Sequence, residues 1–166
     1  MFVEPAKTLT YLMSNGSAFL KRLDLTKEGS LTVEEPFEQI IIAQKHNKFT
    51  KGLCSSEDDR FLFIGAGVVP IITNIITGVQ DWYGKNVKND YLDLEVPMRD
   101  IDASFIKDNK WISVLTADRK IRLYDTRGTN RRPAKDIALP VTEKCLMTRM
   151  LVSPCETYYY VSNDIG

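Results

Sequence analysis

Histidine and cysteine are scarce in this chain of 166 residues, which has one histidine, His46, and three cysteines. Cys54, Cys145 and Cys155 are far apart in the sequence, so together with His46 they lack the close ligand spacing of a zinc site. We interpret the cysteines as small, buried apolar residues in a reducing compartment. We therefore expect neither a metal site nor a cofactor.

Long apolar runs and an excess of one charge are also missing. No apolar run approaches the roughly 20 residues that a membrane helix needs, and residues 1–5 lack the basic start and apolar core of a signal peptide. Lysine plus arginine number 22, as do aspartate plus glutamate. A net charge of zero gives the chain no overall attraction to nucleic acid or to an anionic membrane, although local patches can still bind them. We expect no membrane partner.

Groupings of residues typical of catalytic sites are absent as well. The acidic pairs come without a nucleophile, a base or a phosphate-binding loop, and we place them in turns or at strand edges. They are Glu34-Glu35, Asp58-Asp59 and Asp100 with Asp102. Gly65-Ala66-Gly67 lacks the third glycine and the following helix of a dinucleotide-binding motif. We therefore expect no catalytic residues, no small-molecule substrate and no enzymatic activity.

What the chain does contain is many short β-rich segments separated by turn residues. In residues 100–106, for example, Ile101, Ala103 and Phe105 alternate with polar side chains, which is typical of a half-buried strand. No segment shows a sustained helical period, and residues 39–47 alone leave a short helix open as an alternative to a strand. This pattern predicts an all-β fold.

The most informative segment is a predicted hairpin, in which Lys110–Ala117 and Lys120–Asp125 are strands joined by Asp118-Arg119. The spacing from Asp118 to Tyr124-Asp125 is that of a WD repeat, where Trp-Asp usually stands in place of Tyr124-Asp125. We assign structural roles to Asp118, Tyr124 and Asp125. Because the Gly-His dipeptide of strong WD repeats is absent, we expect the turn at Asp118 to be tied weakly or in another way.

The same pattern recurs 46 residues later, where Asp164 corresponds to Asp118 and receives the same structural role. The WD-repeat period is about 40–45 residues. Looser copies give blade-like units at about 7–37, 48–84, 100–140 and, incomplete, 146–166. The sequence thus predicts one WD-type β-propeller domain, incomplete, with about three to four four-stranded blades. We expect a portion of a larger ring; the alternative is a short β protein that closes by forming oligomers.

Two motifs stand out on either side of the turn at Asp118-Arg119: Lys85–Pro97 (KNVKNDYLDLEVP), and Arg122–Asp125 followed by Arg131–Pro133. Together they resemble motifs of a WD-repeat family, the nucleolar factors that assemble the large ribosomal subunit. The resemblance implies a non-catalytic scaffold in assembly of the precursor of the large ribosomal subunit, located in the nucleus and nucleolus. It implies other pre-ribosomal assembly factors as partners, an AAA-type ATPase that acts on the particle, and rRNA as a candidate contact. The alternative is a WD-repeat adaptor of another complex.

Two loops supply the candidate partner-binding residues. The candidates are Lys85, Asn86, Lys88, Asn89 and Asp90 in the first loop, and Arg127, Arg131 and Arg132 in the second. In the first loop, the alternatives are contact with a partner and capping of the loop's own backbone by its Asn and Asp side chains. In the second loop, they are contact with an rRNA phosphate and a solvated basic loop.

Several apolar and aromatic residues are predicted to have structural roles. We expect four of them to pin the first loop to the blades: Val87, Leu92, Leu94 and Val96. Tyr158–Tyr160 are expected to pack between blades rather than stack on bases, with alternate rings on opposite faces of a strand. Trp82 and Trp111 are expected to lie in the core or to cover an edge.

Overall fold

The computed structural model describes residues 7–12, 17–25, 31–33, 38–41, 49–55, 59–74, 77–141 and 145–165, with side chains from residue 49 onward except that of Cys54. Every regular element in these ranges is a β-strand, and all strand pairs are antiparallel. The all-β prediction is therefore confirmed. These ranges contain no helix that could span a membrane. Glu34-Glu35, His46 and Asp58 lie outside them.

The first sheet is centred on its second strand. It contains β1 (Lys7–Leu12), β2 (Ser17–Leu25), β3 (Leu31–Val33) and β4 (Glu38–Ile41). Leu20 of β2 pairs with Thr10 of β1 and with Glu38 of β4, so β1 and β4 lie along opposite edges of β2. Strand β4 shows that residues 39–41, where strand and helix were both open, are extended; residues 42–47 lie outside the described ranges.

The second and third sheets are four-stranded meanders, in which each strand pairs with the next one along the chain. The second contains β5 (Phe49–Cys54), β6 (Arg60–Gly65), β7 (Val68–Asn74) and β8 (Gln80–Tyr83). The third contains β9 (Asp100–Ile106), β10 (Trp111–Thr116), β11 (Lys120–Asp125) and β12 (Lys135–Ala138). The tight turns between β6 and β7 and between β10 and β11 place consecutive strands side by side, which favours a meander.

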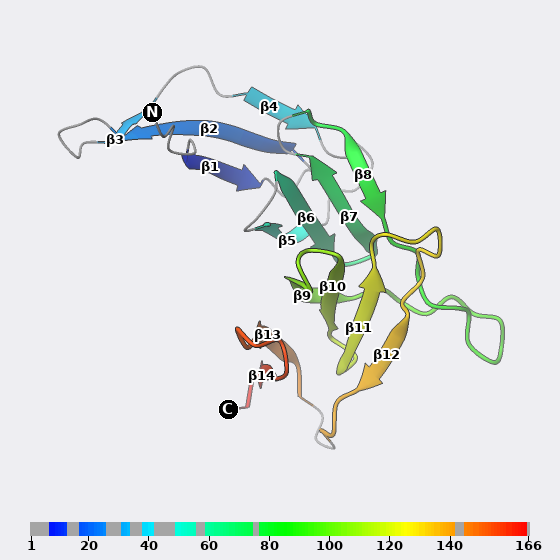
Figure 1. Ribbon diagram of the computed structural model, residues 1–166. Coiled ribbons are helices and arrows are strands. Elements are labelled where there is room, and N and C mark those ends of the chain that lie inside the picture. The colour runs from blue at the N-terminus through cyan, green and yellow to red at the C-terminus, as the bar shows by residue number, and fades with distance from the viewer. Residues whose placement is uncertain are drawn as a thin grey trace.

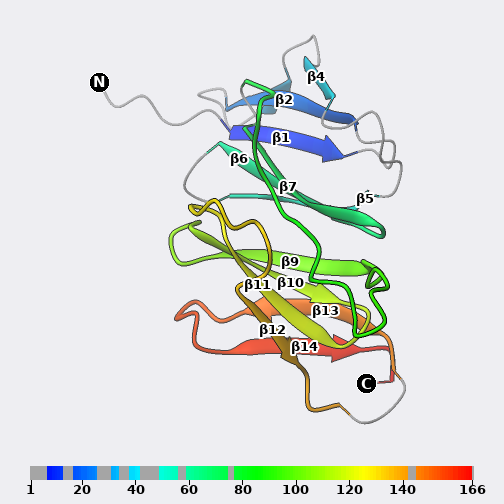
Figure 2. The same cartoon turned by 90° about the vertical axis from the view of Figure 1, so that its right-hand side faces the viewer.

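Within the described residues, the fourth sheet consists of β13 (Met147–Val152) and β14 (Tyr159–Asn163). The four sheets follow one another in chain order, from blue β1 to red β14 (Figures 1 and 2). Strand β9 contacts β5 and β6 on one side and β13 on the other. This is the arrangement of neighbouring blades in a β-propeller, of which the chain forms an incomplete part.

Apolar side chains fill the spaces between the second, third and fourth sheets. One buried cluster joins the second and third sheets: Leu62, Ile64, Ile72, Trp82, Ala103, Ile112, Val114 and Tyr124. Another joins the third and fourth sheets: Leu115, Ile121, Cys145, Met147 and Met150. Central strands β6 and β10 are buried on both faces, whereas β12 is exposed along its length. These three sheets therefore depend on one another for burial, as the units of repeat architectures do.

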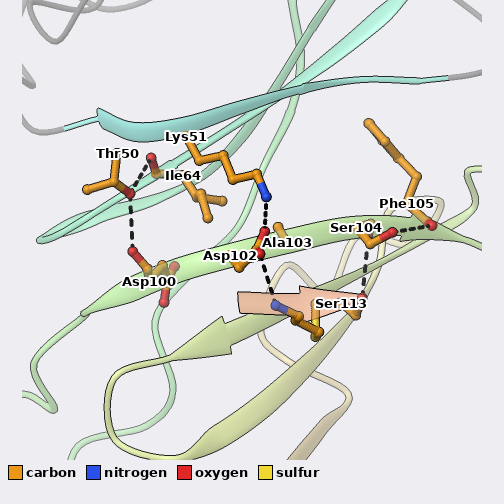
Figure 3. A network of polar contacts seen from close by, with 10 residues as sticks. Thr50, Lys51, Ile64, Asp100, Asp102, Ala103, Ser104, Phe105 and Ser113 are labelled. Atoms are coloured by element: carbon orange, nitrogen blue, oxygen red, sulfur yellow. Dashed lines mark hydrogen bonds and ion pairs between the residues drawn. The ribbon is translucent and has the colours of Figure 1, made fainter. Parts of the chain in front are cut away.

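Asp102, in the middle of β9, connects three sheets. Its Oδ1 pairs with Lys51 Nζ on β5 (Figure 3), and its Oδ2 accepts a 3.0 Å hydrogen bond from the backbone N–H of Met150 on β13. The placement of Asp102 in a turn or at a strand edge was wrong, because the buried carboxylate has partners on both neighbouring sheets. Thr50 adds a second link, with its Oγ1 3.3 Å from the carbonyl oxygen of Asp100 (Figure 3).

The turn between β9 and β10 is a further link between sheets. Lys107, Asp108 and Asn109 all have positive φ, at 52°, 53° and 58°. The N–H of Lys107 donates to both carboxylate oxygens of Glu156 at 2.8 Å, and Arg60 Nη2 donates to the carbonyl oxygen of Asn109 at 3.1 Å. The second and fourth sheets thus hold a backbone conformation that non-glycine residues rarely adopt.

The predicted hairpin of β10 and β11 is confirmed, with Thr116 paired to Lys120 beside the turn. The Thr116 hydroxyl accepts a 3.3 Å hydrogen bond from the Lys120 N–H. The carboxylate of Asp118 lies 3.8 Å from Arg99 Nη1. The contacts that hold the turn at Asp118 therefore differ from those of a strong WD repeat, as expected.

Two sequence-based burial predictions were wrong. Tyr158, just before β14, and Tyr160 are exposed, because the face that they share meets no other described sheet, whereas Tyr159 packs against the cluster between the third and fourth sheets. Cys155 is exposed in a turn, although Cys145 is buried as expected. The prediction for Trp82 is confirmed, since its ring is buried and packs edge-on against Tyr124 with the ring centroids 5.8 Å apart.

Candidate functional site

The two candidate loops meet, although they leave different sheets. The first connects β8 to β9 and the second connects β11 to β12. The N–H of Lys85 donates to the carbonyl oxygen of Arg131 at 2.7 Å, and Arg132 Nη1 donates to that of Asn86 at 2.7 Å. Figure 1 shows both loops on the right-hand side, the first in green and the second in yellow. We call residues 83–97 together with 127–133 the composite loop site.

Two arginines of the second loop fasten the first. The guanidinium carbon of Arg131 lies 3.9 Å from the ring centroid of Tyr83, in a cation–π contact. Arg132 reaches the backbone of Asn86, and its own N–H donates to Asn130 Oδ1 at 3.2 Å. Sequence analysis offered both arginines as partner-binding residues. The structure gives them a role within the fold, and contact with a partner stays a prediction.

Arg127 forms an ion pair with Asp125, the last residue of the strand that precedes it. Its Nη2 lies 2.7 Å from Asp125 Oδ2, and its Nε and backbone N–H donate to Asp125 Oδ1 at 2.9 and 3.0 Å. These hydrogen bonds lower the pKa of Asp125 to about 2 and raise the pKa of Arg127. The pair neutralises part of the charge that the sequence suggested for phosphate binding.

The first loop caps its own backbone, which is one of the two alternatives above. Asp90 Oδ1 accepts hydrogen bonds from the N–H groups of Leu92 and Leu94, at 2.8 and 2.9 Å. Asn89 Nδ2 donates to the backbone carbonyl and to the side chain of Asp93, at 3.1 and 3.0 Å. Asn86 Nδ2 donates to the carbonyl oxygen of Val96 at 2.6 Å. The loop therefore has a defined shape of its own, set by Asx-type bonds.

The prediction that apolar residues pin this loop is wrong for two of the four. Leu92 and Leu94 are exposed, because the Asp90 carboxylate holds the tip in a turn that leaves their side chains in solvent. Val87 and Val96, nearer the loop's ends, are half-buried. Lys85 and Lys88 are exposed, and neither forms an ion pair with another described residue.

A hollow of about 380 Å³ lies where the two loops join. Its lining comes from β7, the start and end of the first loop, and one arginine of the second: Val69, Tyr83, Gly84, Lys85, Asn86, Val87, Asn89, Glu95, Met98 and Arg132. A Cβ atom at Gly84 would lie 3.2 Å from Pro70 and 3.3 Å from both Trp82 and Tyr124, so the chain passes the core closely at this point.

Sequence analysis missed Tyr83 and Gly84. Each serves the composite loop site through residues far away in the chain: Tyr83 through Arg131, and Gly84 through its close approach to Tyr124. An aromatic residue followed by glycine at the start of a long polar loop was the available signal. It could have marked the start of the loop, but it could not identify the partners.

The residues assigned structural roles lie apart from the loops or beneath them. Asp118 is at the opposite end of β11 from Arg127, since Thr116 pairs with Lys120 and Trp111 with Asp125. Tyr124 is buried in the core. Asp164 Oδ1 accepts a 2.9 Å hydrogen bond from the N–H of Leu146 in the fourth sheet.

A buried polar cluster lies in the third sheet. Asp100 is 2% exposed, and neither of its carboxylate oxygens has a hydrogen-bond partner among the described residues. Burial raises the pKa of Asp100 to about 7, although nearby Arg122 acts in the opposite direction. Arg122 is itself buried, with Nε 3.5 Å from Asp136 Oδ1. The described ranges hold no group of His, Cys, Asp and Glu that could bind a metal ion.

Comparison with known proteins shows partial similarity to one WD-repeat protein. WD repeat-containing protein 74 from Homo sapiens and from Mus musculus are each 41% identical to this chain over 82 residues, or 49% of it. The Bos taurus protein is 41% identical over 49 residues. These matches span 20%, 21% and 13% of the human, mouse and bovine proteins. No family model matches the chain.

Solved structures of Hsv2 share the fold. Hsv2 of Kluyveromyces lactis has a TM-score of 0.62 at 10% identity, over 97% of this chain and 60% of that one. Hsv2 of Kluyveromyces marxianus has a TM-score of 0.59 at 9% identity, over 95% and 55%. At such identities the likeness concerns the fold alone. It confirms the predicted incomplete WD-type β-propeller.

Proposed function

We propose that this protein is a non-catalytic scaffold in the assembly of the large ribosomal subunit precursor. The observation that carries the proposal is the composite loop site, because the two segments that resemble the nucleolar family lie side by side there. The 41% identity to WD repeat-containing protein 74 over about half of the chain supports the same family.

The scaffold would act by docking. Its stacked sheets fix the positions of both loops, and hydrogen bonds within the first loop fix its shape. The partners would be other pre-ribosomal assembly factors in the nucleolus, with an AAA-type ATPase removing the protein as the particle matures. Loops held by a rigid scaffold commonly carry such contacts.

The test is affinity purification of the tagged protein from cells, with the co-purifying RNA and proteins separated by sedimentation. We expect precursor rRNA of the large subunit together with assembly factors. Recovery of mature ribosomes alone, or of no ribosomal particle, would overturn the proposal.

The alternative function is that of a WD-repeat adaptor in another complex, which the fold alone supports equally well. Imaging the tagged protein separates the two proposals. A scaffold for the precursor particle should concentrate in the nucleolus, whereas exclusion from the nucleolus would favour the adaptor.

Contact with rRNA is a separate part of the proposal, and the exposed Lys85 and Lys88 test it best. Reversing Arg131 and Arg132 would also break the contacts between the loops, so its effect would be ambiguous. If the lysines contact phosphates, Lys85→Glu with Lys88→Glu should weaken particle binding and reduce its salt dependence. Lys135→Glu, on exposed β12, is the control. An unchanged salt dependence would show that the lysines are only solvated.

A further inference from the structure

The tip of the first loop exposes three large apolar side chains within four residues. Tyr91 is 92% exposed, Leu92 60% and Leu94 58%. Figure 1 shows this loop projecting away from the sheets. Single exposed apolar residues are common, but several grouped at a projecting point usually mark an interaction site.

The tip is held in its exposed position by specific contacts. Asp90 accepts the N–H groups of Leu92 and Leu94, and its own N–H donates to the carbonyl oxygen of Leu94 at 2.9 Å. The loop is also fixed at its base, where the N–H of Gly84 donates to the carbonyl oxygen of Pro70 at 2.7 Å and Met98 accepts from Gly67 at 2.8 Å. A loop ordered before binding loses little conformational entropy on binding, which favours affinity.

The charge around the tip indicates the kind of partner. Asp90, Asp93 and Glu95 are interleaved with the apolar residues and are exposed, and residues 89–97 contain no lysine or arginine. Three carboxylates repel the phosphates of RNA, so the tip itself is unsuited to a nucleic acid. They favour a protein surface that presents arginine or lysine.

We propose that Tyr91, Leu92 and Leu94 form an anchor that inserts into an apolar pocket, edged by basic side chains, on a partner protein. The anchor rests on the proposed scaffold function and identifies the chemistry of one partner of the composite loop site. Tyrosine in a pocket surrounded by complementary charge is a common centre of binding energy at protein interfaces. Glu95, exposed beside Leu94, would contact the basic edge of the pocket.

Crosslinking in the purified particle identifies the partner. A photoreactive p-benzoylphenylalanine replaces Tyr91 in the tagged protein, and mass spectrometry identifies the partner residue to which it is crosslinked. We expect the crosslink on a protein, at an apolar pocket flanked by arginine or lysine. A crosslink to RNA, a crosslink to a second copy of this chain, or no crosslink within the bound particle would each overturn the anchor.

Affinity measurements with that partner, once purified, test the energetics. Tyr91→Ala should lower the affinity about tenfold or more, and Glu95→Lys should slow association most at low salt. Val79→Ser is the matched control, because Val79 is 59% exposed and lies outside both loops. Because Tyr91 is 92% exposed, we expect its truncation to leave the melting temperature unchanged. Equal affinity of the Tyr91→Ala and Val79→Ser variants would overturn the anchor.

The two proposals fail in distinguishable ways. If the wild-type protein recovers no precursor particle, the ribosomal function fails, and crosslinking in whatever complex is recovered still tests the anchor. If the wild-type and Tyr91→Ala proteins recover the same particle with the same proteins at equal yield in high salt, the anchor fails and the scaffold function stands.

Discussion

At the scale of single residues, the carboxylate of Asp100 is buried without a hydrogen-bond partner among the described residues. Its ionised form is disfavoured by loss of solvation, which outweighs the opposing effect of Arg122, and nearby Asp118 acts in the same direction as burial. Since its pKa is about 7 in the folded chain and about 3.8 without burial, the folded state binds a proton that the unfolded state has lost between pH 4 and 7.

Asp100→Asn should therefore remove a pH dependence of stability. In the wild-type chain, the contribution of this group to the free energy of unfolding falls as the pH rises from 4 to 7, by up to ~4 kcal/mol, and is constant above. Urea unfolding at several pH values measures it. Asp125 titrates below this window, because its pKa is lowered to about 2. The exposed control Asp108→Asn should keep the wild-type dependence of the unfolding free energy on pH. The same pH dependence in Asp100→Asn would contradict the assignment to Asp100.

Of the two cysteines whose side chains the structure describes, Cys155 is the one we expect to be more reactive toward alkylation. Hydrogen bonds from Ser153, and then from Thr157, lower the pKa of its thiol to about 7. Iodoacetamide should modify it with a midpoint near pH 7, while Cys145 stays unmodified in the folded chain because it is buried. Ser153→Ala should raise the midpoint, and Ser162→Ala should leave it unchanged. Peptide mass spectrometry follows both cysteines, and equal labelling would contradict the prediction.

At the scale of elements, Asp102 shows what fastens one sheet to the next. Asp102→Ala removes the partner of Lys51 and of the Met150 N–H, and it should cost about 1–3 kcal/mol of unfolding free energy, since the buried Met150 N–H loses its acceptor and the partly exposed Lys51 loses its counter-charge. Lys110→Ala breaks the exposed pair with Asp108 and should cost at most ~1 kcal/mol. Chemical denaturation compares them. Equal losses would mean that Asp102 does not link the sheets.

The contact between the loops can be tested through a single backbone N–H. Arg131→Ala removes the cation–π contact with Tyr83, worth about 0.5–1 kcal/mol at an exposed site, so the Lys85 N–H should exchange about two- to fivefold faster. Hydrogen exchange followed by NMR measures this rate. Lys135→Ala is the control, and an unchanged rate for Lys85 would show that Arg131 does not hold the loop.

Elements that depend on neighbours in the chain could be predicted from the sequence. The near alternation of Ile121, Leu123 and Tyr124 with polar residues identified β11, and the adjoining turn identified its partner β10. The contacts of Asp102 could not be predicted, because its partners lie 51 and 48 residues away on other sheets.

The candidate loops were likewise predicted one at a time. Each was marked by its composition, but their junction depends on Tyr83 and Arg131, which no local pattern pairs. The exposure of Leu92 and Leu94 was missed because the Asp90 carboxylate, rather than apolar packing, shapes the tip.

At the scale of the whole molecule, the fourth sheet presents an apolar surface. Leu151, Tyr158 and Tyr160 are all exposed on β13, β14 and the turn before β14. The chain covers 60% of the Hsv2 propeller that it resembles. In a propeller, an adjoining sheet buries such a face, and a free face of this kind tends to associate.

We therefore expect this chain, purified alone, to self-associate as its concentration rises. Leu151→Lys combined with Tyr160→Lys should weaken association about tenfold or more, because burying one such side chain contributes about 1.5–3 kcal/mol. Sedimentation equilibrium measures the association constant of the wild-type chain and of the variants. Val79→Lys, exposed elsewhere, is the control. A wild-type chain that stays monomeric at all concentrations would contradict the prediction.

The bond between Arg132 and Asn86 joins residues 46 positions apart, and this separation has a consequence during synthesis. At about 5–20 residues per second, Asn86 is made roughly 2–9 s before Arg132. The first loop therefore lacks its hydrogen bond to Arg132 until the following blade has been translated. A partner that requires the fastened loop cannot bind the nascent chain during this interval. The following blade must therefore fold before that partner can assemble with the protein.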